Sequence, residues 1–199
     1  MHNSLKENNF MISQLWATNR LQFIRQAEKL KDTLRSSFTS RGRPESTAEH
    51  SWRVCLMAMT FEDQLKSLNW SKILKLCVIH DLGEALHGDI PAVKKMDSMK
   101  KTQQERVDLL RLMESLDDER KKDLLQLWED YEQNLSIEAQ VVKAFDKLET
   151  LLQHNQGDNP VDFDYQFNLT YGQDQTNISP LFIKLRKIID EETIKKIKL

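Results

Sequence analysis

The sequence has 199 residues, a length that suits one domain or at most two small ones. It contains only 5 Gly and 4 Pro, and a chain so poor in turn residues is unsuited to a sandwich or barrel of many short strands. Charged residues make up 30%, and their net charge of −2 provides no basic surface for nucleic acid or an anionic membrane. We therefore expect a mostly helical protein that binds no membrane, and nucleic acid is disfavoured as a partner.

Hydrophobic periodicity predicts about seven helices in one all-α domain that spans residues 1–199. Every Gly and Pro falls within one of two windows, 42–91 and 157–180, so the remaining chain can form long uninterrupted elements. Residues 155–180 are expected to form one long loop before the last helix. The predicted helices cover residues 8–34, 46–64, 70–86, 101–116, 118–133, 136–154 and 180–197.

The helix expected at 46–64 has a clear start signal. Residues 46–49 read Ser-Thr-Ala-Glu, a capping box in which Ser46 would cap the helix and Glu49 would reach back to the cap. The helix expected at 70–86 is different, because six of the seven residues from 73 to 79 are apolar. A helix that is apolar on all sides is buried, so this one should lie at the centre of the bundle.

Two features of the sequence bear on where the protein is found. Cys55 and Cys77 both lie within apolar helical stretches, so free thiols are expected rather than a disulfide. The first ten residues lack a continuous apolar stretch of the kind that forms a secretory signal, and no apolar stretch is long enough to span a bilayer. These features predict a cytoplasmic protein.

An ionisable pair, His80 and Asp81, directly follows the apolar stretch that ends at Ile79. Burying such a pair costs free energy unless each group is paired or binds a metal. If the helix continued through the pair, His87 and Glu84 would share with it an arc of roughly 120°, at about 100° per residue. Judged on this helix alone, a structural ion pair and a functional site explain the pattern equally well.

Two further ionisable residues extend the pattern. His50 stands in the first turn after the capping box, and Asp146 interrupts an apolar helix face one turn after Val142. Taken alone, each residue is more often structural, either as a histidine at a helix start or as a solvated edge carboxylate. Together with His80 and Asp81 they form the ordered set His…His-Asp…Asp, with gaps of 30 and 65 positions.

This ordered set resembles the HD-domain metal-dependent phosphohydrolases. It is most similar to the branch that holds the 5′-deoxynucleotidases and HD-domain-containing protein 2. A lone His-Asp dipeptide carries no weight, whereas the whole set in this order is a specific signal. The resemblance extends over about residues 20–155 and is carried by the segments 43–51, 80–84, 88–91, 127–132 and 142–149. The fold that it implies is a single HD domain.

The resemblance implies that one divalent metal is held by His50, His80, Asp81 and Asp146. Two imidazoles and two carboxylates suit a borderline or hard ion, namely Mn, Co, Mg, Fe or Zn. Such an ion polarises a phosphate and lowers the pKa of a bound water, which then becomes a nucleophile at neutral pH.

The resemblance also assigns roles to residues outside the metal set. It implies that Glu84 orients or deprotonates the attacking water and that Asp89 helps to hold the substrate or this water. Arg43 is the first candidate for binding the phosphate, since guanidinium groups bind phosphate in bidentate fashion. Arg35 and Arg41 are further candidates. The family usually has Trp where this chain has Phe38, which leaves the choice between deoxyribose and ribose open.

The activity that the resemblance implies is hydrolysis of nucleoside 5′-monophosphates, the deoxy forms in particular, to nucleoside and phosphate. The alternatives are a phosphodiesterase or a nucleotide triphosphohydrolase of the same family, or a regulatory module that binds a nucleotide without turnover. A purely binding module would need neither Glu84 nor Asp89, which favours an enzyme. The family resemblance also implies a homodimer.

Overall fold

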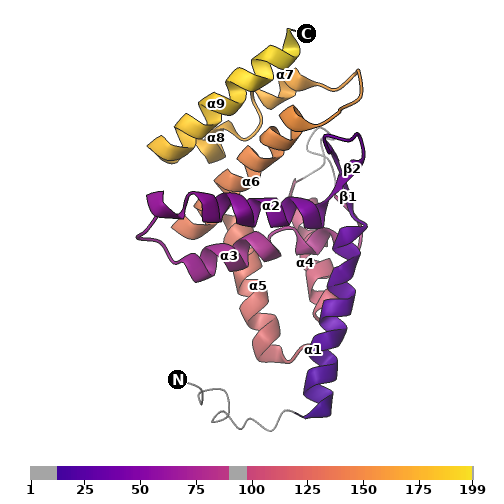
Figure 1. Cartoon of the computed structure of the whole chain (residues 1–199). Helices are drawn as coiled ribbons and strands as arrows, with labels where there is room; N and C mark the ends of the chain where they lie inside the picture. The colour runs from indigo at the N-terminus through magenta and orange to yellow at the C-terminus, as the bar shows by residue number, and fades with distance from the viewer. Residues whose placement is uncertain (1–12, 90–97, 199) are drawn as a thin grey trace, which may run out of the picture.

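The computed structural model of the chain describes residues 13–89 and 98–198. This part of the chain is an α-helical bundle that carries one small sheet (Figure 1). Its α-helices are α1 (Gln14–Ala27), α2 (Thr47–Thr60), α3 (Trp70–Ile79), α4 (Ser98–Leu112), α5 (Asp118–Gln133), α6 (Ile137–Gln156), α7 (Tyr165–Asn168), α8 (Gln173–Thr176) and α9 (Pro180–Ile197).

The other elements are short, and they consist of three 3₁₀ helices and an antiparallel pair of strands. They are η1 (Glu28–Lys31), η2 (Glu62–Gln64), η3 (Leu82–Ala85), β1 (Leu34–Phe38) and β2 (Pro44–Ser46). The predicted all-α class is thus confirmed, with nine α-helices in the described residues where about seven were expected. Within 13–89 and 98–198, no helix combines the length and the apolar character needed to cross a membrane.

Helix α6 is the element around which the bundle is built. In Figure 1 it rises from behind α2 toward α7 and α9, while α1 and α5 extend on the other side of α2. Its apolar face packs with α2, α3 and α9 in one core cluster, which includes Val54, Leu76, Phe145, Leu148 and Phe182. A second cluster joins η1, η3, α4 and α5 around Trp128.

The first predicted helix, 8–34, is wrong in its extent. Residues 8–12 lie outside the described part of the chain, and α1 ends at Ala27, where the backbone tightens into η1. The chain then forms the β1–β2 hairpin, whose turn is closed by a hydrogen bond from the Thr39 amide to the Arg43 carbonyl, 2.8 Å long. Gly42 sits in this turn with a φ of +75°, in the left-handed region that favours glycine.

The helix predicted at 70–86 is also wrong, because α3 ends at Ile79 and the chain turns at His80 and Asp81 before η3 begins. The four ionisable side chains therefore do not share one helical arc. Gly83 explains the local path: a Cβ at this position would lie 2.8 Å from the carbonyl oxygen of Glu105. Helix α4 thus packs directly on η3, and a larger residue would push the two apart.

The segment 155–180 is not the long loop that was predicted, because it contains the short helices α7 and α8. Arg186 of α9 fastens this segment to the bundle. Its guanidinium donates hydrogen bonds to the backbone carbonyls of Asn168, Leu169 and Tyr171, over 2.7–3.1 Å. A segment held in this way has a defined position beside α6 and α9.

The predicted capping box at the start of α2 is confirmed. The Glu49 amide donates to Ser46 Oγ over 3.3 Å, and the Ser46 amide donates to Glu49 Oε2 over 2.9 Å. The box fixes the first turn of α2, which is the turn that carries His50. It also ties this turn to strand β2, which ends at Ser46.

Candidate metal centre

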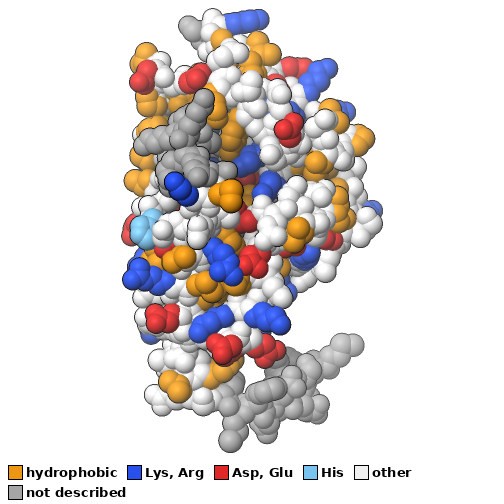
Figure 2. Space-filling model, turned by 180° about the vertical axis from the view of Figure 1, so that it is seen from behind, with side chains coloured by type: hydrophobic (Ala, Val, Ile, Leu, Met, Phe, Trp, Pro, Cys, Tyr) orange, Lys and Arg blue, Asp and Glu red, His pale blue; other side chains and the backbone are white. Residues whose placement is uncertain are grey.

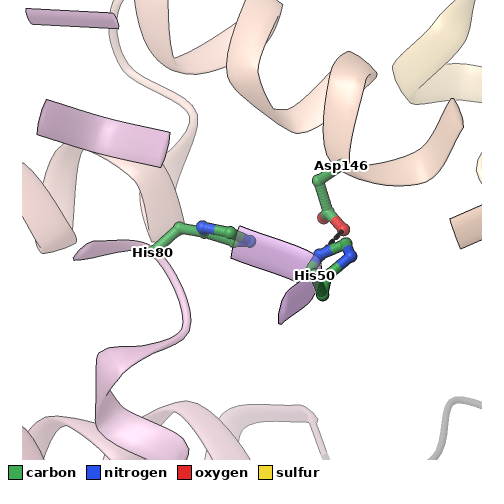
Figure 3. Close-up of side chains that lie close together, drawn as sticks. All are labelled: His50, His80 and Asp146. Carbon is green, nitrogen blue, oxygen red and sulfur yellow. Dashed lines mark ion pairs between the residues drawn. The ribbon is translucent and has the colours of Figure 1, made fainter. Parts of the chain in front are cut away.

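Three segments that are distant in the sequence bring buried ionisable side chains together. His50 comes from the first turn of α2, His80 and Asp81 from the turn after α3, and Asp146 from the middle of α6. One ligand atom from each of His50, His80 and Asp146 lies within 4.8 Å of the others. Figure 3 shows the His80 side chain directed toward the paired His50 and Asp146.

The atoms that face one another in this group have the character of metal ligands. His50 Nε2 lies 3.2 Å from Asp146 Oδ1 and 3.7 Å from Asp81 Oδ2, and His80 Nε2 lies 3.2 Å from the same Asp81 oxygen. Both Nε2 atoms are buried without a hydrogen-bond partner among the described residues. Buried polar atoms normally have partners, so two such nitrogens beside two carboxylates fit a divalent cation.

The other nitrogen of each histidine ring is already engaged. His80 Nδ1 lies 2.9 Å from the carbonyl oxygen of Cys77, to which it can only donate. His50 Nδ1 lies 2.5 Å from Glu149 Oε2. In both rings Nε2 is consequently the atom left to bind a metal, a common arrangement in metalloproteins.

Asp146 is held by three neighbours. Its Oδ2 accepts hydrogen bonds from the Tyr131 hydroxyl over 2.6 Å and from Lys147 Nζ over 2.9 Å, so Oδ1 is left to face His50. Burial alone would raise the pKa of Asp146, but Lys147 and His50 hold this pKa well below its usual range. Asp146 is therefore an anion at neutral pH.

His50 is the group of this centre whose proton competes most directly with a metal. Burial and Arg35 lower its pKa, but Glu149 and Asp146 outweigh them and raise it to about 9.

A metal that binds His50 Nε2 must displace the second ring proton. We therefore expect the affinity of the protein for Mn²⁺ to rise about ten-fold from pH 7 to pH 8. Calorimetric titration with Mn²⁺ in two buffers should show about one proton released. Equal affinity for Mn²⁺ at pH 7 and pH 8 would contradict the assignment of His50 as a ligand that must lose a proton.

Glu84 lies close to this group, on η3, with only 5% of its surface exposed. Thr47 Oγ1 donates to its Oε2 over 3.4 Å, and Lys101 Nζ donates to its Oε1 over 3.3 Å. Burial and the negative charges of Asp81 and Asp89 raise the pKa of Glu84 well above its ordinary value. A buried carboxyl whose pKa is raised in this way is suited to accept and return a proton.

Asp89 is half-buried and directly follows Gly88, whose φ is +86°. Its charge is near enough to contribute to the raised pKa of Glu84. The last two residues of the 88–91 motif, Ile90 and Pro91, lie outside the described residues.

The three candidate arginines take different places. Arg35, on β1, reaches the centre: Nη1 lies 3.5 Å from Asp81 Oδ2, and Nη2 donates to Thr150 Oγ1 over 3.0 Å. Arg43 is exposed and forms a bidentate pair with Glu49, over 2.5 and 2.9 Å. Arg41 is exposed in the hairpin turn. The structure therefore brings Arg35, but neither Arg43 nor Arg41, to the buried group.

No local pattern in the sequence predicts a role for Tyr131, Lys147 or Glu149. All three lie inside the segments that carry the family resemblance, 127–132 and 142–149, which was the only signal available for them. Their importance rests on contacts between α2, α5 and α6 that no local pattern in the sequence shows.

Together, the fold and this site define a helical protein with a buried His–His–Asp group suited to a divalent metal. The HD domain family matches residues 27–186, and the chain belongs to that family.

Among curated proteins, the chain is similar to "5′-deoxynucleotidase HDDC2" of Danio rerio, with 35% identity over 137 residues, which is 68% of each chain. The protein of the same name from Homo sapiens is 34% identical over 69% of this chain and 67% of its own. A third relative, "5′-deoxynucleotidase YBR242W" of Saccharomyces cerevisiae, is 29% identical over 67% of this chain and 58% of its own.

Solved structures share the fold. A predicted metal-dependent phosphohydrolase from Magnetospirillum magnetotacticum superposes with a TM-score of 0.70 at 22% identity, covering 92% of this chain and 95% of its own. A conserved hypothetical protein from Pyrococcus furiosus gives a TM-score of 0.57 at 28% identity, covering 87% of this chain and 98% of its own. The expected family and fold class are thus confirmed.

Proposed function

We propose that this chain is a metal-dependent phosphomonoesterase that hydrolyses nucleoside 5′-monophosphates, the deoxy forms in particular, to nucleoside and inorganic phosphate. The observation that carries the proposal is the meeting of His50, His80 and Asp146, with Asp81 beside them, in a protein of the HD-domain family. Several relatives at 33–35% identity bear the name 5′-deoxynucleotidase, which supports the substrate class.

The metal ligands in this proposal are His50, His80, Asp81 and Asp146. A divalent ion held by them would polarise the phosphate and provide a nucleophilic water, and Mn, Co, Mg, Fe and Zn all suit the donor set. The other steps belong to the protein. Lys147 and Tyr131 keep Asp146 oriented and ionised, so that its Oδ1 remains turned toward His50.

Glu84 and Asp89 are the groups proposed to handle the water and the substrate. Glu84 accepts a proton from the attacking water as the new P–O bond forms. The bond from phosphorus to the nucleoside O5′ breaks, and Glu84 returns the proton to O5′, which leaves as the nucleoside hydroxyl. Thr47 and Lys101 hold the Glu84 carboxylate in place for this transfer. Asp89 is proposed to hold the nucleotide or the water from the turn that follows Gly88.

Arg35 is the arginine that we propose binds the phosphate, because it alone of the three candidates contacts the buried group. We expect Arg35→Met to raise the KM for a deoxynucleoside 5′-monophosphate about 10- to 100-fold, since a charge-assisted hydrogen bond contributes about 1.5–3 kcal/mol. Arg43→Met and Arg41→Met should change KM less than about two-fold. A large rise in KM for Arg43→Met, with none for Arg35→Met, would return the role to Arg43.

The proposed activity is tested by incubating the purified protein with Mn²⁺ or Co²⁺ and a panel of deoxy- and ribonucleoside 5′-monophosphates. The expected product is inorganic phosphate. Cyclic dinucleotides and deoxynucleoside triphosphates serve as comparison substrates, because a phosphodiesterase would release linear nucleotides and a triphosphohydrolase would release a polyphosphate. Tight nucleotide binding without any product would instead identify a regulatory module and overturn the proposal.

We also propose that the protein forms one domain over residues 1–199 and acts as a homodimer in the cytoplasm. The exposed apolar side chains of Trp52, Leu56 and Met59, which follow one another along one face of α2, support an interface between copies. Both cysteines are free, which suits a reducing compartment. Light scattering coupled to gel filtration tests the dimer, and the mass of a single chain would overturn it.

Nucleic acid and membranes are not proposed as partners. Figure 2 shows that acidic and basic side chains are interspersed along the middle of one face of the molecule, instead of forming one basic area. A mixed surface of this kind offers no strong field to a polyanion, and the net charge of −2 agrees with it.

A further inference from the structure

Among the histidines of residues 13–89 and 98–198, His50 is unusual because both nitrogens of its buried ring face carboxylates. On one side Nε2 faces Asp146 and Asp81, which belong to the candidate metal centre. On the other side Nδ1 lies 2.5 Å from Oε2 of Glu149, a residue with no exposed surface. Glu149 follows Asp146 by three positions on α6, so one face of this helix reaches both sides of the same ring.

We propose that Glu149 is a positioning residue for the metal centre, which holds the His50 ring with its proton on Nδ1 and Nε2 turned toward the metal. This inference rests on the metal centre of the proposed function. An ionised carboxylate can only accept a hydrogen bond, so Nδ1, which faces Glu149, carries a proton. Nε2 also faces carboxylates, and a cation bound there by Asp81 and Asp146 would displace any proton from it. The lone pair of the imidazole would then be on Nε2, on the side of the cation.

A second contact explains how Glu149 keeps its charge while buried. Arg53, one turn after His50 on α2, places Nε 3.2 Å from Glu149 Oε1. The same guanidinium donates hydrogen bonds to the side chains of Gln153 and Gln156, further along α6. A buried carboxylate costs free energy unless it is paired, and Arg53 provides the pair. Glu149 is therefore fixed from the side opposite to the ring that it orients.

The two histidines of the centre differ in the group that holds Nδ1. His80 donates from Nδ1 to the backbone carbonyl of Cys77, which no substitution can remove. His50 depends on a side chain, and its partner Glu149 can be changed without altering any proposed ligand. Carboxylate partners of this kind raise the basicity of a ligating imidazole as well as orienting it.

The test compares the metal affinity of the full-length wild type and Glu149→Gln, measured by calorimetry with Mn²⁺. The neutral amide has one oxygen, so it cannot both accept the hydrogen bond from His50 Nδ1 and preserve the ion pair with Arg53. We expect affinity to fall about 10- to 100-fold. The matched control is Asp108→Asn, because Asp108 is a buried carboxylate that pairs with a different histidine, His87, over 2.6 Å. It should leave affinity within about two-fold.

A spectroscopic measurement keeps the inference testable even if Glu149→Gln does not fold. Long-range ¹H–¹⁵N spectra of the Zn²⁺-loaded wild type should show His50 with a proton on Nδ1 and the metal on Nε2. A proton on Nε2, or a metal bound through Nδ1, would overturn the inference. Unchanged Mn²⁺ affinity in a folded Glu149→Gln protein would overturn the role of Glu149 and leave the proposed metal centre in place. Absence of metal binding in the wild type would overturn the metal centre of the proposed function, and the inference with it.

Discussion

Glu84→Gln is expected to lower kcat on a deoxynucleoside 5′-monophosphate by roughly 10²- to 10⁴-fold, which is the usual contribution of a general base. The amide keeps the size of the carboxyl group and can still accept the hydrogen bond from Thr47. It cannot take a proton from the attacking water. Because Glu84 is not a proposed ligand, the affinity for Mn²⁺ should stay within about three-fold. Phosphate release at saturating Mn²⁺ measures the first quantity, and calorimetry measures the second.

The pH profile and a matched variant separate catalysis from structure. As a base, Glu84 acts only when ionised, so kcat should fall as the pH drops below its raised pKa, and this acid limb should be lost in Glu84→Gln. Glu105 is the control, because it is another largely buried carboxylate bound to Lys101, over 3.2 Å. We expect Glu105→Gln to lower kcat less than ten-fold. Equal losses in the two variants would remove Glu84 from its proposed role.

Asp146→Asn is expected to abolish stable metal binding and to lower kcat/KM by at least ~10³-fold, because a bound Lewis acid supplies several kcal/mol of stabilisation to the transition state. The amide oxygen can still accept from Tyr131 and Lys147. The group that faces His50 then becomes an NH₂, which cannot bind a cation.

The measurement for Asp146→Asn is metal content after dialysis, followed by phosphate release with added Mn²⁺. Asp190→Asn is the control, since Asp190 on α9 pairs with Arg186 over 2.7 Å and belongs to no proposed site. This control should keep both its metal and its activity. Full metal content and activity in Asp146→Asn would exclude Asp146 as a ligand.

The helices that the sequence predicts best are those with local signals. The capping box marks the start of α2, and α5 covers the predicted range 118–133. The β1–β2 hairpin was missed because its strands are only five and three residues long and carry no turn of the Asn-Gly type. The break after Ile79 was also missed, since the sequence stays apolar there while the close packing of α4 on Gly83 imposes η3.

The proposed metal ligands were predictable, because the order of His and Asp residues along the chain identifies them. The ordered set His50, His80, Asp81 and Asp146 could be proposed because each ligand sits in a recognisable segment. The contacts of Arg35 and Glu149 could not, because they join residues 46 to 115 positions apart, across β1, α2, the turn after α3 and α6. The sequence makes Arg43 the first candidate for binding phosphate, because it does not show that the Arg43 guanidinium pairs with Glu49, six residues later.

The most direct test of the account is to locate the metal. Crystals grown with Mn²⁺ and measured at a wavelength where this ion scatters anomalously should give one strong peak, bounded by His50 Nε2, His80 Nε2 and the carboxylates of Asp81 and Asp146. A peak bound elsewhere, with none at this position in a protein that releases phosphate from deoxynucleoside 5′-monophosphates, would contradict the proposed centre.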